Sequence, residues 1–513
     1  MRRLFLGVAV ALTTASMLFA GGQGESTAAS PAQTGDGKPT ITFMLTDFSG
    51  HSLKNENSDK VIAACEDYTG THVTWRFEQD STYEEKLGIT LMDKENMPMI
   101  LTCKRSLSSN IISAAQQGAF WDLSNYIFDE KEYPNLSKAN KDVLKALTVD
   151  GQVIGIYRAR AIGRNGFSYR KDWAEKVGIT KDPQTVQDVY DMMYKFTYGD
   201  PDGNGKNDTY GLELTKWTGP LDVIQTWFGC GNEWVLQDGK LIPVHQTKEF
   251  MEALDWMEKM YADGLVRKDW PTVDSGTFSD ACKKGTAGIF IDVMDGAKRV
   301  WQYYVKNKIP SVMNPAESAS MVLQGPVAGH TLATTGFNGY YVITKAGAKT
   351  EQDLKNCLHF LDKMCDDKMM VLADYGIEGL TYDMVDGHVV LRKFDTATAP
   401  QNGLNQSVCY IPNLSATNPT LNKDAPTKAQ DDAYANNLNY AVFNPALGYL
   451  ANSPINAEVG TDIEQIIDDA RTQYICGQID KKGFEKAAQQ WLDRGGAKLI
   501  EEVNALYQKD KNK

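Results

Sequence analysis

The 513-residue sequence lacks the features that mark several common functional classes. Its net charge is −13 and no basic stripe stands out, so nucleic acid is not expected as a partner. The eight cysteines are scattered, without a CxxC pair or zinc-type spacing, and no disulfide pairing is predicted. Phosphate-cradling GxxxxGK(S/T) and GxGxxG loops are missing, and so is an HExxH motif. No Ser, His and Asp arrangement stands out among only six histidines, so an enzyme is not predicted.

Long apolar runs are also lacking, except at the N-terminus. Met1, Arg2 and Arg3 precede an apolar run, and the small residue Ala20 is followed by polar residues. This pattern predicts a secretory signal peptide over 1–20, with an uncleaved anchor as the alternative. Residues 21–37 are small and polar and predict a flexible tether. The protein is therefore expected to be exported to the periplasm or the extracellular space. Membrane association stays open, because no cysteine near the cleavage site indicates a lipobox.

Strand and helix patterns alternate along the remaining chain. Alternating or apolar segments predict strands over 39–45, 72–77, 97–102, 287–291 and 339–343. Amphipathic segments predict helices over 60–68, 83–93, 186–196, 248–264, 351–370, 462–474 and 482–506. This order is typical of an α/β fold with mostly parallel sheets.

The length and the two series of elements predict two α/β lobes joined by a hinge, with helical C-terminal additions. Such sheets bind ligands beyond the carboxyl ends of their strands, so the cleft between the lobes is the expected binding site. The expected division assigns 38–157 and 335–372 to the N-terminal lobe. The C-terminal lobe is expected to comprise 158–334 and 373–513.

Six short motifs follow one another along most of the chain. They are 117–123 (QGAFWDL), 169–173 (YRKDW), 200–212 (DPDGNGKNDTYGL), 261–266 (YADGLV), 285–291 (GTAGIFI) and 375–379 (YGIEG). Together they resemble extracellular solute-binding proteins of ABC transporters, in the sugar-binding, lipoprotein-type branch that includes alginate-binding periplasmic proteins. The resemblance implies a two-lobed type 2 periplasmic-binding-protein fold and a monomer that delivers an oligosaccharide to ABC permease transmembrane subunits. The missing lipobox cysteine departs from that branch.

The segment from 200 to 208 has the spacing of a cation-binding loop. Side-chain oxygens recur at alternate positions, a backbone carbonyl can fill the gap at Lys206, and Gly205 permits a sharp turn. This pattern predicts a structural Ca²⁺ site formed by Asp200, Asp202, Asn204, Lys206 and Asp208. Gly211 stands where an EF-hand loop has its bidentate Glu, and a polar turn without an ion stays open as the alternative. An analogous loop holds Ca²⁺ in the alginate-binding relatives, which have an acidic residue at the position of Thr209.

Three tryptophans cluster in a glycine-rich stretch at positions 217, 227 and 234. Aromatic faces cover the apolar faces of sugar rings, so Trp217, Trp227 and Trp234 are candidate ligand contacts. Trp227 has helical spacing with Leu221 and Ile224, and a position in the core is its alternative.

Charged residues near the expected crossover and strand ends complete the candidate site. Arg158 and Arg160 lie where the chain should cross between the lobes, and their planar forks suit an acidic sugar. Surface ion pairs are the alternative for Arg160. Further candidates are Asp47, Lys104 and Asp292, which follow predicted strands, and Tyr340 and Glu378, which the resemblance implies.

The function predicted from these patterns is the capture of an oligosaccharide by a binding protein. A binding protein for peptides or another small solute would have the same architecture. An enzyme acting on glycans would need two carboxylates across a bond, and the many acidic residues leave such a pair open.

Overall fold

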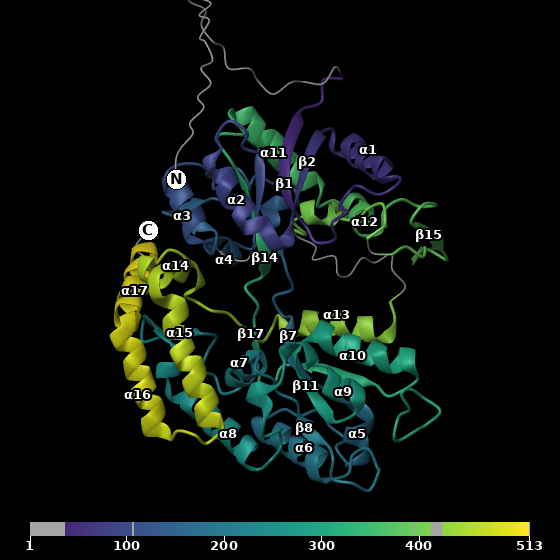
Figure 1. Ribbon diagram of the computed structural model, residues 1–513, viewed down its shortest axis with the longest axis vertical. Helices are drawn as coiled ribbons and strands as arrows, with labels where there is room; N and C mark the ends of the chain where they lie inside the picture. The colour runs from purple at the N-terminus through teal and green to yellow at the C-terminus, as the bar shows by residue number, and fades with distance from the viewer. Residues whose placement is uncertain (1–35, 105–106, 396, 412–422, 512–513) are drawn as a thin grey trace, which may run out of the picture.

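A computed structural model describes residues 36–104, 107–395, 397–411 and 423–511. It has two α/β lobes, one above the other in Figure 1, with a group of helices alongside them. The predicted two-lobed architecture is confirmed. The expected signal peptide and most of the expected tether lie outside the described residues.

The first lobe is built on a five-stranded sheet in the order β2-β1-β3-β14-β6. β1 pairs in parallel with β2 and β3, whereas β14 is antiparallel to both β3 and β6. The strands are β1 (Thr40–Asp47), β2 (His72–Gln79), β3 (Ile100–Cys103), β6 (Ile156–Ala159) and β14 (Phe337–Ile343). The helices are α1 (Ser58–Thr69), α2 (Tyr83–Met92), α3 (Ser109–Gln116), α4 (Lys141–Lys145), α11 (Glu351–Lys363) and α12 (Asp367–Tyr375).

The second lobe has a four-stranded sheet in the order β12-β7-β11-β8. Only β8 and β11 pair in parallel here, so the expectation of mostly parallel sheets is wrong for this lobe. The strands are β7 (Asn165–Arg170), β8 (Tyr210–Leu212), β11 (Ala287–Val293) and β12 (Met321–Gly325). The helices are α5 (Lys171–Lys176), α6 (Val186–Tyr198), α7 (Gly219–Thr226), α8 (Lys248–Ala262), α9 (Asp280–Lys284), α10 (Met294–Asn307) and α13 (Ala425–Asn437).

Two adjacent segments cross between the lobes. The first connects β6 to β7 and the second connects β13 (Thr331–Leu332) to β14. The two crossings are joined by a hydrogen bond from the Arg160 amide to the Gly336 carbonyl (2.9 Å). Ile411 lies in the first lobe and Lys423 precedes α13 of the second, and residues 412–422 between them are outside the described ones.

The C-terminal helices touch both lobes. α14 (Leu447–Ala451) lies against the first lobe, and Asn452 donates to the Thr148 carbonyl (2.7 Å). α15 (Pro454–Ile475), α16 (Lys481–Trp491) and α17 (Ala497–Lys511) pack against the second lobe, beside α8 and the hairpin of β9 (Trp234–Gln237) and β10 (Lys240–Pro243). The helix expected over 482–506 is interrupted by a π-helical turn at Leu492–Gly496, where Gly495 has a φ of 128°.

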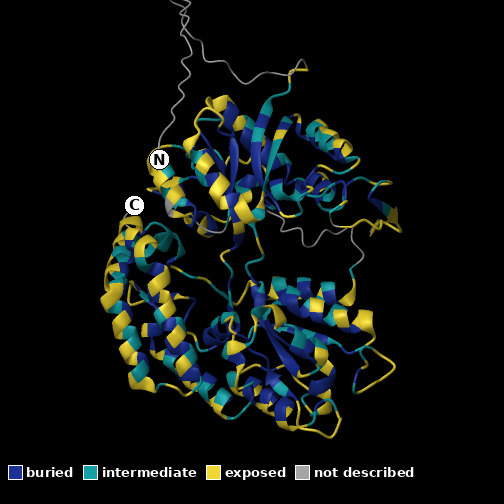
Figure 2. Ribbon diagram, in the orientation of Figure 1, coloured by how far each residue is buried: buried dark blue, intermediate teal, exposed yellow. Residues whose placement is uncertain are grey.

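Each lobe has its own buried core, dark blue in Figure 2. The core of the first lobe also contains Leu404, Val408, Cys409 and Ile411, which follow the hairpin of β15 (Tyr382–Val385) and β16 (His388–Leu391). The expected division placed these residues in the C-terminal lobe. They belong to the first lobe because the Ala159 amide donates to the Cys409 carbonyl (2.8 Å), which attaches this segment to the edge of β6.

All eight cysteines are unpaired thiols, and seven of them are buried. Among the described residues, no helix combines the length and apolar character that a membrane crossing requires.

Candidate functional site

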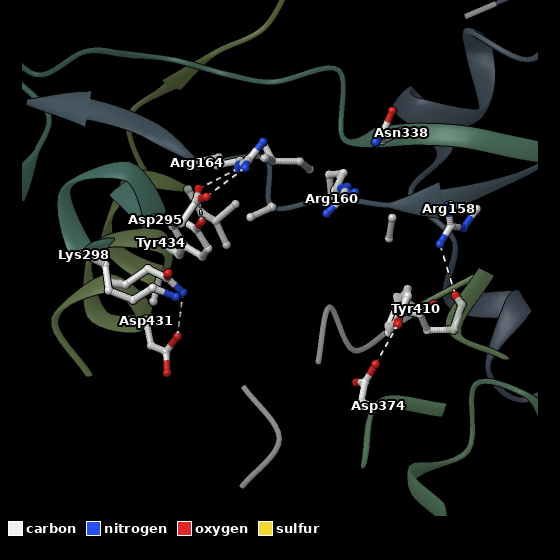
Figure 3. A pocket seen from close by; sticks show the side chains of 18 of the residues that line it. Arg158, Arg160, Arg164, Asp295, Lys298, Asn338, Asp374, Tyr410, Asp431 and Tyr434 are labelled. Atoms are coloured by element: carbon white, nitrogen blue, oxygen red, sulfur yellow. Dashed lines mark hydrogen bonds and ion pairs between the residues drawn. The ribbon is translucent and has the colours of Figure 1, made fainter. Parts of the chain in front are cut away.

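A pocket of about 620 Å³ lies at the first crossing and has walls from both lobes (Figure 3). The first lobe contributes the residue after β1, the end of β6, the start of β14, α12 and the segment 405–410. The second lobe contributes α10 and α13. The residues that carry polar or aromatic groups are Phe48, Arg158, Arg160, Arg164, Asp295, Lys298, Asn338, Asp374, Asn405, Gln406, Tyr410, Gln430, Asp431 and Tyr434.

Three arginines follow one another along the floor of the pocket, and two of them have protein partners. Arg158 donates from Nη2 to the Asn405 carbonyl (3.1 Å) and from Nε to the Val408 carbonyl (3.4 Å). Arg164 forms a bidentate pair with Asp295, at 2.8 and 3.0 Å. Arg160 lies between them and forms no side-chain hydrogen bond or ion pair with any described residue. Burial, together with the charges of Arg158 and Arg164, lowers its pKa.

Asp295 organises the second-lobe wall. It lies in the first turn of α10 and accepts hydrogen bonds from Arg164, from Arg299 Nη1 (2.6 Å) and from the Tyr434 hydroxyl (3.0 Å). Burial alone would raise its pKa, but these hydrogen bonds, above all those from Arg164, hold the pKa of Asp295 well below its ordinary value. The Asp295 carboxylate is therefore already neutralised within the protein.

Asp374 and Tyr410 face the pocket from the first lobe. The Tyr410 hydroxyl donates to Asp374 Oδ1 at 3.0 Å. Burial raises the pKa of Asp374 to about 6, against the opposing effect of this hydrogen bond. Asp374 therefore changes its charge just below neutral pH, within a ligand-sized pocket.

Of the ten expected ligand contacts, the pocket brings together Arg158 and Arg160. Asp47 was expected to face ligand, but its Oδ1 instead accepts hydrogen bonds from the amides of Ser49 and Gly50 and from the Ser52 hydroxyl. These hydrogen bonds organise the turn after β1. The neighbouring residue, Phe48, is the one that lines the pocket, and it is 65% exposed.

Three expected contacts lie in hydrophobic cores, which corrects the interpretation made from the sequence. Trp227 packs edge-on against Phe167 and Trp256, and Trp234 belongs to the cluster under the C-terminal helices. Tyr340 is fully buried in the first lobe. Each is at most 3% exposed, because its element turns that face toward the core rather than toward the cleft.

The other four expected contacts lie outside the lining of this pocket. Lys104 follows β3 and pairs with Asp80 (2.5 Å). Trp217 follows β8, is 41% exposed and packs edge-on against Phe278. Asp292 lies in β11, where burial raises its pKa to about 6, and Glu378 is exposed in the turn after α12.

Tyr410, Asp374, Tyr434 and Asn338 were missed by the sequence interpretation. Tyr410 and Asp374 come from the segment after β14 that was assigned to the other lobe. A weak signal was present for Tyr434, since it is the single aromatic residue of α13, a helix without a clear apolar stripe.

The loop from Asp200 to Asp208 connects α6 to β8 and brings the expected oxygen ligands close together. The Asn204 side-chain amide donates to Asp202 (2.7 Å) and to Asp208 (3.2 Å), while the Gly205 amide donates to both oxygens of Asp200 (3.2 Å). Burial, a hydrogen bond with Asp200 and the charge of Asp208 raise the pKa of Asp202. The carboxylates of Asp200, Asp202 and Asp208 therefore lie near one another, and amide groups of the loop donate hydrogen bonds to them. Among the described residues, this loop included, no group of three or more His, Cys, Asp or Glu is arranged to hold a metal ion.

The chain belongs to the bacterial extracellular solute-binding protein family, whose sequence profile matches residues 54–351. It is 36% identical to the lipoprotein LipO of Bacillus subtilis, over 98% of both chains. It is 29% identical to the polygalacturonan/rhamnogalacturonan-binding protein YtcQ of the same organism, over 96% of both chains. The predicted family resemblance is confirmed.

Solved structures share the fold at low sequence identity. An extracellular solute-binding protein from Bifidobacterium longum subsp. infantis superposes with a TM-score of 0.66 at 16% identity, covering 93% of this chain and 99% of that one. The alginate-binding protein AlgQ2, solved without calcium ion, has a TM-score of 0.60 at 15% identity, with 92% and 98% covered. The substrate-binding protein FusA of Streptococcus pneumoniae, in complex with kestose, has a TM-score of 0.60 at 18% identity, with 92% and 100% covered.

Proposed function

We propose that this protein is the binding component of an ABC importer and captures an oligosaccharide in the pocket between its lobes. The observation that carries the proposal is the two-lobed lining of the pocket, in which aromatic rings alternate with hydrogen-bonding groups. Tyr410 and Phe48 come from one lobe and Tyr434 from the other. Rings cover the apolar faces of sugars, and Asn, Gln, Asp and Arg bind their hydroxyls. The polygalacturonan/rhamnogalacturonan-binding relative and FusA, solved in complex with kestose, support the same ligand class.

Capture would proceed by closure about the crossings. A ligand that contacts both lobes stabilises the closed state by its extra contacts there, and that state would dock on the permease. The units that we propose to move are 38–159 with 337–411, and 165–332 with 423–513. In the closed state, Phe48 and Tyr410 would face α10 and α13 across the ligand.

The Asp200 loop would hold a structural Ca²⁺. Asp200, Asp202, Asn204 and Asp208 would supply side-chain oxygens and Lys206 its carbonyl. The cation would neutralise the converging carboxylates and hold α6 against β8, in the second lobe and outside the pocket. We further propose that the protein is exported and acts as a monomer. Membrane attachment, which the lipoprotein relative suggests, would require a group outside the described residues.

A thermal-shift screen tests the ligand class, because a ligand that binds only the folded state raises the melting temperature. The panel contains neutral and acidic oligosaccharides, short peptides and free amino acids. Stabilisation by oligosaccharides alone is the expected result, whereas stabilisation by peptides alone would overturn the carbohydrate assignment. Oligosaccharides that stabilise the protein are then incubated with it and analysed by chromatography. Cleavage products would identify an enzyme instead.

A further inference from the structure

We infer that the ligand carries a carboxylate, as in an oligosaccharide of uronic acids, and that Arg160 binds this carboxylate. The inference rests on the proposed function, since it names the chemical class of sugar that the same pocket would accept. It follows from the charges that line the pocket and from the partners that each of them has.

The side chain of Arg160 is a cation without a protein partner, held at the centre of the pocket. Its amide is fixed by the Gly336 carbonyl of the second crossing, so the side chain extends from a rigid part of the hinge. Arg158 and Arg164 lie on either side: Arg158 donates to two backbone carbonyls, and Arg164 pairs with Asp295. Within the described chain no carboxylate pairs with Arg160, and the stretches 105–106, 396 and 412–422 contain no Asp or Glu.

The rest of the lining leaves an excess of positive charge, although the whole chain carries −13. Asp295 is held by Arg164 and Arg299, and Asp431 accepts from Lys423 (2.7 Å). Lys298 forms no ion pair with a described residue. Among the lining carboxylates, only Asp374 remains to balance Arg158, Arg160 and Lys298. Closure of the lobes would remove water from these cations, and an anionic ligand would compensate for that loss.

A planar carboxylate suits the guanidinium because it accepts two parallel hydrogen bonds from the fork. The rings of Tyr410, Tyr434 and Phe48 surround the same space and provide flat apolar surface for the pyranose that bears the acid group. A uronic acid places both features on one ring.

Isothermal titration of the full chain at fixed pH and ionic strength tests the inference. The probes are trimers of galacturonate, glucuronate and mannuronate, their methyl esters, which differ only in the charge, and neutral and sulfated oligosaccharides. We expect one uronate trimer to bind at least roughly 10-fold more tightly than its ester, the size of a charge-assisted hydrogen bond. Arg160→Gln should weaken that trimer roughly 10- to 100-fold and leave the ester unchanged. Arg160→Lys should restore part of the difference.

Arg494→Gln, an exposed arginine in the C-terminal helices, is the control for net charge and should bind like the unmodified chain. Binding of neutral or sulfated oligosaccharides in preference to every uronate would overturn the inference and leave the proposed function standing. Equal affinity for acid and ester, or an Arg160→Gln variant with unchanged preference, would overturn it too. If no sugar in the panel binds, both the inference and the proposed function fall.

Discussion

Arg164 and Asp295 form a two-point ion pair that joins the first crossing to the start of α10, with Nε–Oδ1 at 2.8 Å and Nη2–Oδ2 at 3.0 Å. The Asp295 side chain is 14% exposed and that of Arg164 33%. The pair holds the chain that leaves the first lobe against a rigid helix of the second. It also neutralises the positive charge of Arg164, whereas Arg158 donates to backbone carbonyls and Arg160 has no side-chain partner among the described residues.

Asp295→Asn should therefore destabilise the second lobe by about 1–3 kcal/mol, since it leaves Arg164 and Arg299 without their shared carboxylate. Urea denaturation measures the change, with Asp238→Asn in the exposed β9–β10 turn as the control. The folded-state pKa of Asp295 lies below its unfolded value, so its contribution is present above about pH 4 and declines as the pH falls further. A variant as stable as the control at pH 7 would show that the pair contributes nothing.

Asp374 should make the binding of an acidic ligand depend on pH. Its pKa of about 6 means that it loses its negative charge as the pH falls from 7.5 to 5.5, while the carboxylates of a uronate remain ionised. The affinity should rise by roughly a factor of two to three over this range, the size expected of one screened charge. Titrations at the two pH values measure the effect.

The matched variant is Asp374→Asn, which keeps an acceptor for the Tyr410 hydroxyl. It should bind the uronate at pH 7.5 as tightly as the unmodified protein does at pH 5.5, and show little dependence on pH. Asp386→Asn, in the exposed turn between β15 and β16, should retain the dependence. If Asp374→Asn retains it as well, another group is responsible.

The order of elements, the two lobes and the arginines of the crossing could be predicted from sequence, because each depends on local pattern. Which face of each helix or strand is turned toward the core could not be predicted from the sequence. Trp227 follows α7 at a spacing that fits either a core or a cleft position, and the packing of Phe167 and Trp256 decides for the core. Tyr410 was beyond prediction for another reason. It reaches the pocket because Cys409 pairs with Ala159, 250 residues earlier in the chain.

Calcium should stabilise the protein through the Asp200 loop. The cation would replace the hydrogen bonds by which the Asn204 side-chain amide now links Asp202 to Asp208. At about 100 times the dissociation constant, a cation bound only to the folded state adds about 2.7 kcal/mol, which corresponds to a rise of a few degrees in melting temperature. Thermal melts with Ca²⁺, with Mg²⁺ and with chelator measure the rise in melting temperature.

Asp202→Asn should abolish the rise and Asn207→Ala, in the same loop, should preserve it. Equal melting temperatures with Ca²⁺ and chelator would leave the loop as a polar turn.

Substitution of Trp227 should mainly lower stability, whereas substitution of Trp217 should mainly weaken ligand binding. Trp227 is buried between two aromatic rings, so Trp227→Ala should cost about 3–5 kcal/mol of unfolding free energy, as large core truncations do. Trp217 is 41% exposed in the segment after β8, outside the lining of the pocket, and we propose that it contacts ligand once the lobes close. Trp217→Ala should change stability by at most about 1 kcal/mol and weaken oligosaccharide binding roughly 10-fold through lost stacking. Denaturation and titration of the same two preparations give both quantities. Because the two residues lie in one segment and carry the same side chain, an unchanged affinity in Trp217→Ala would remove Trp217 from the binding site.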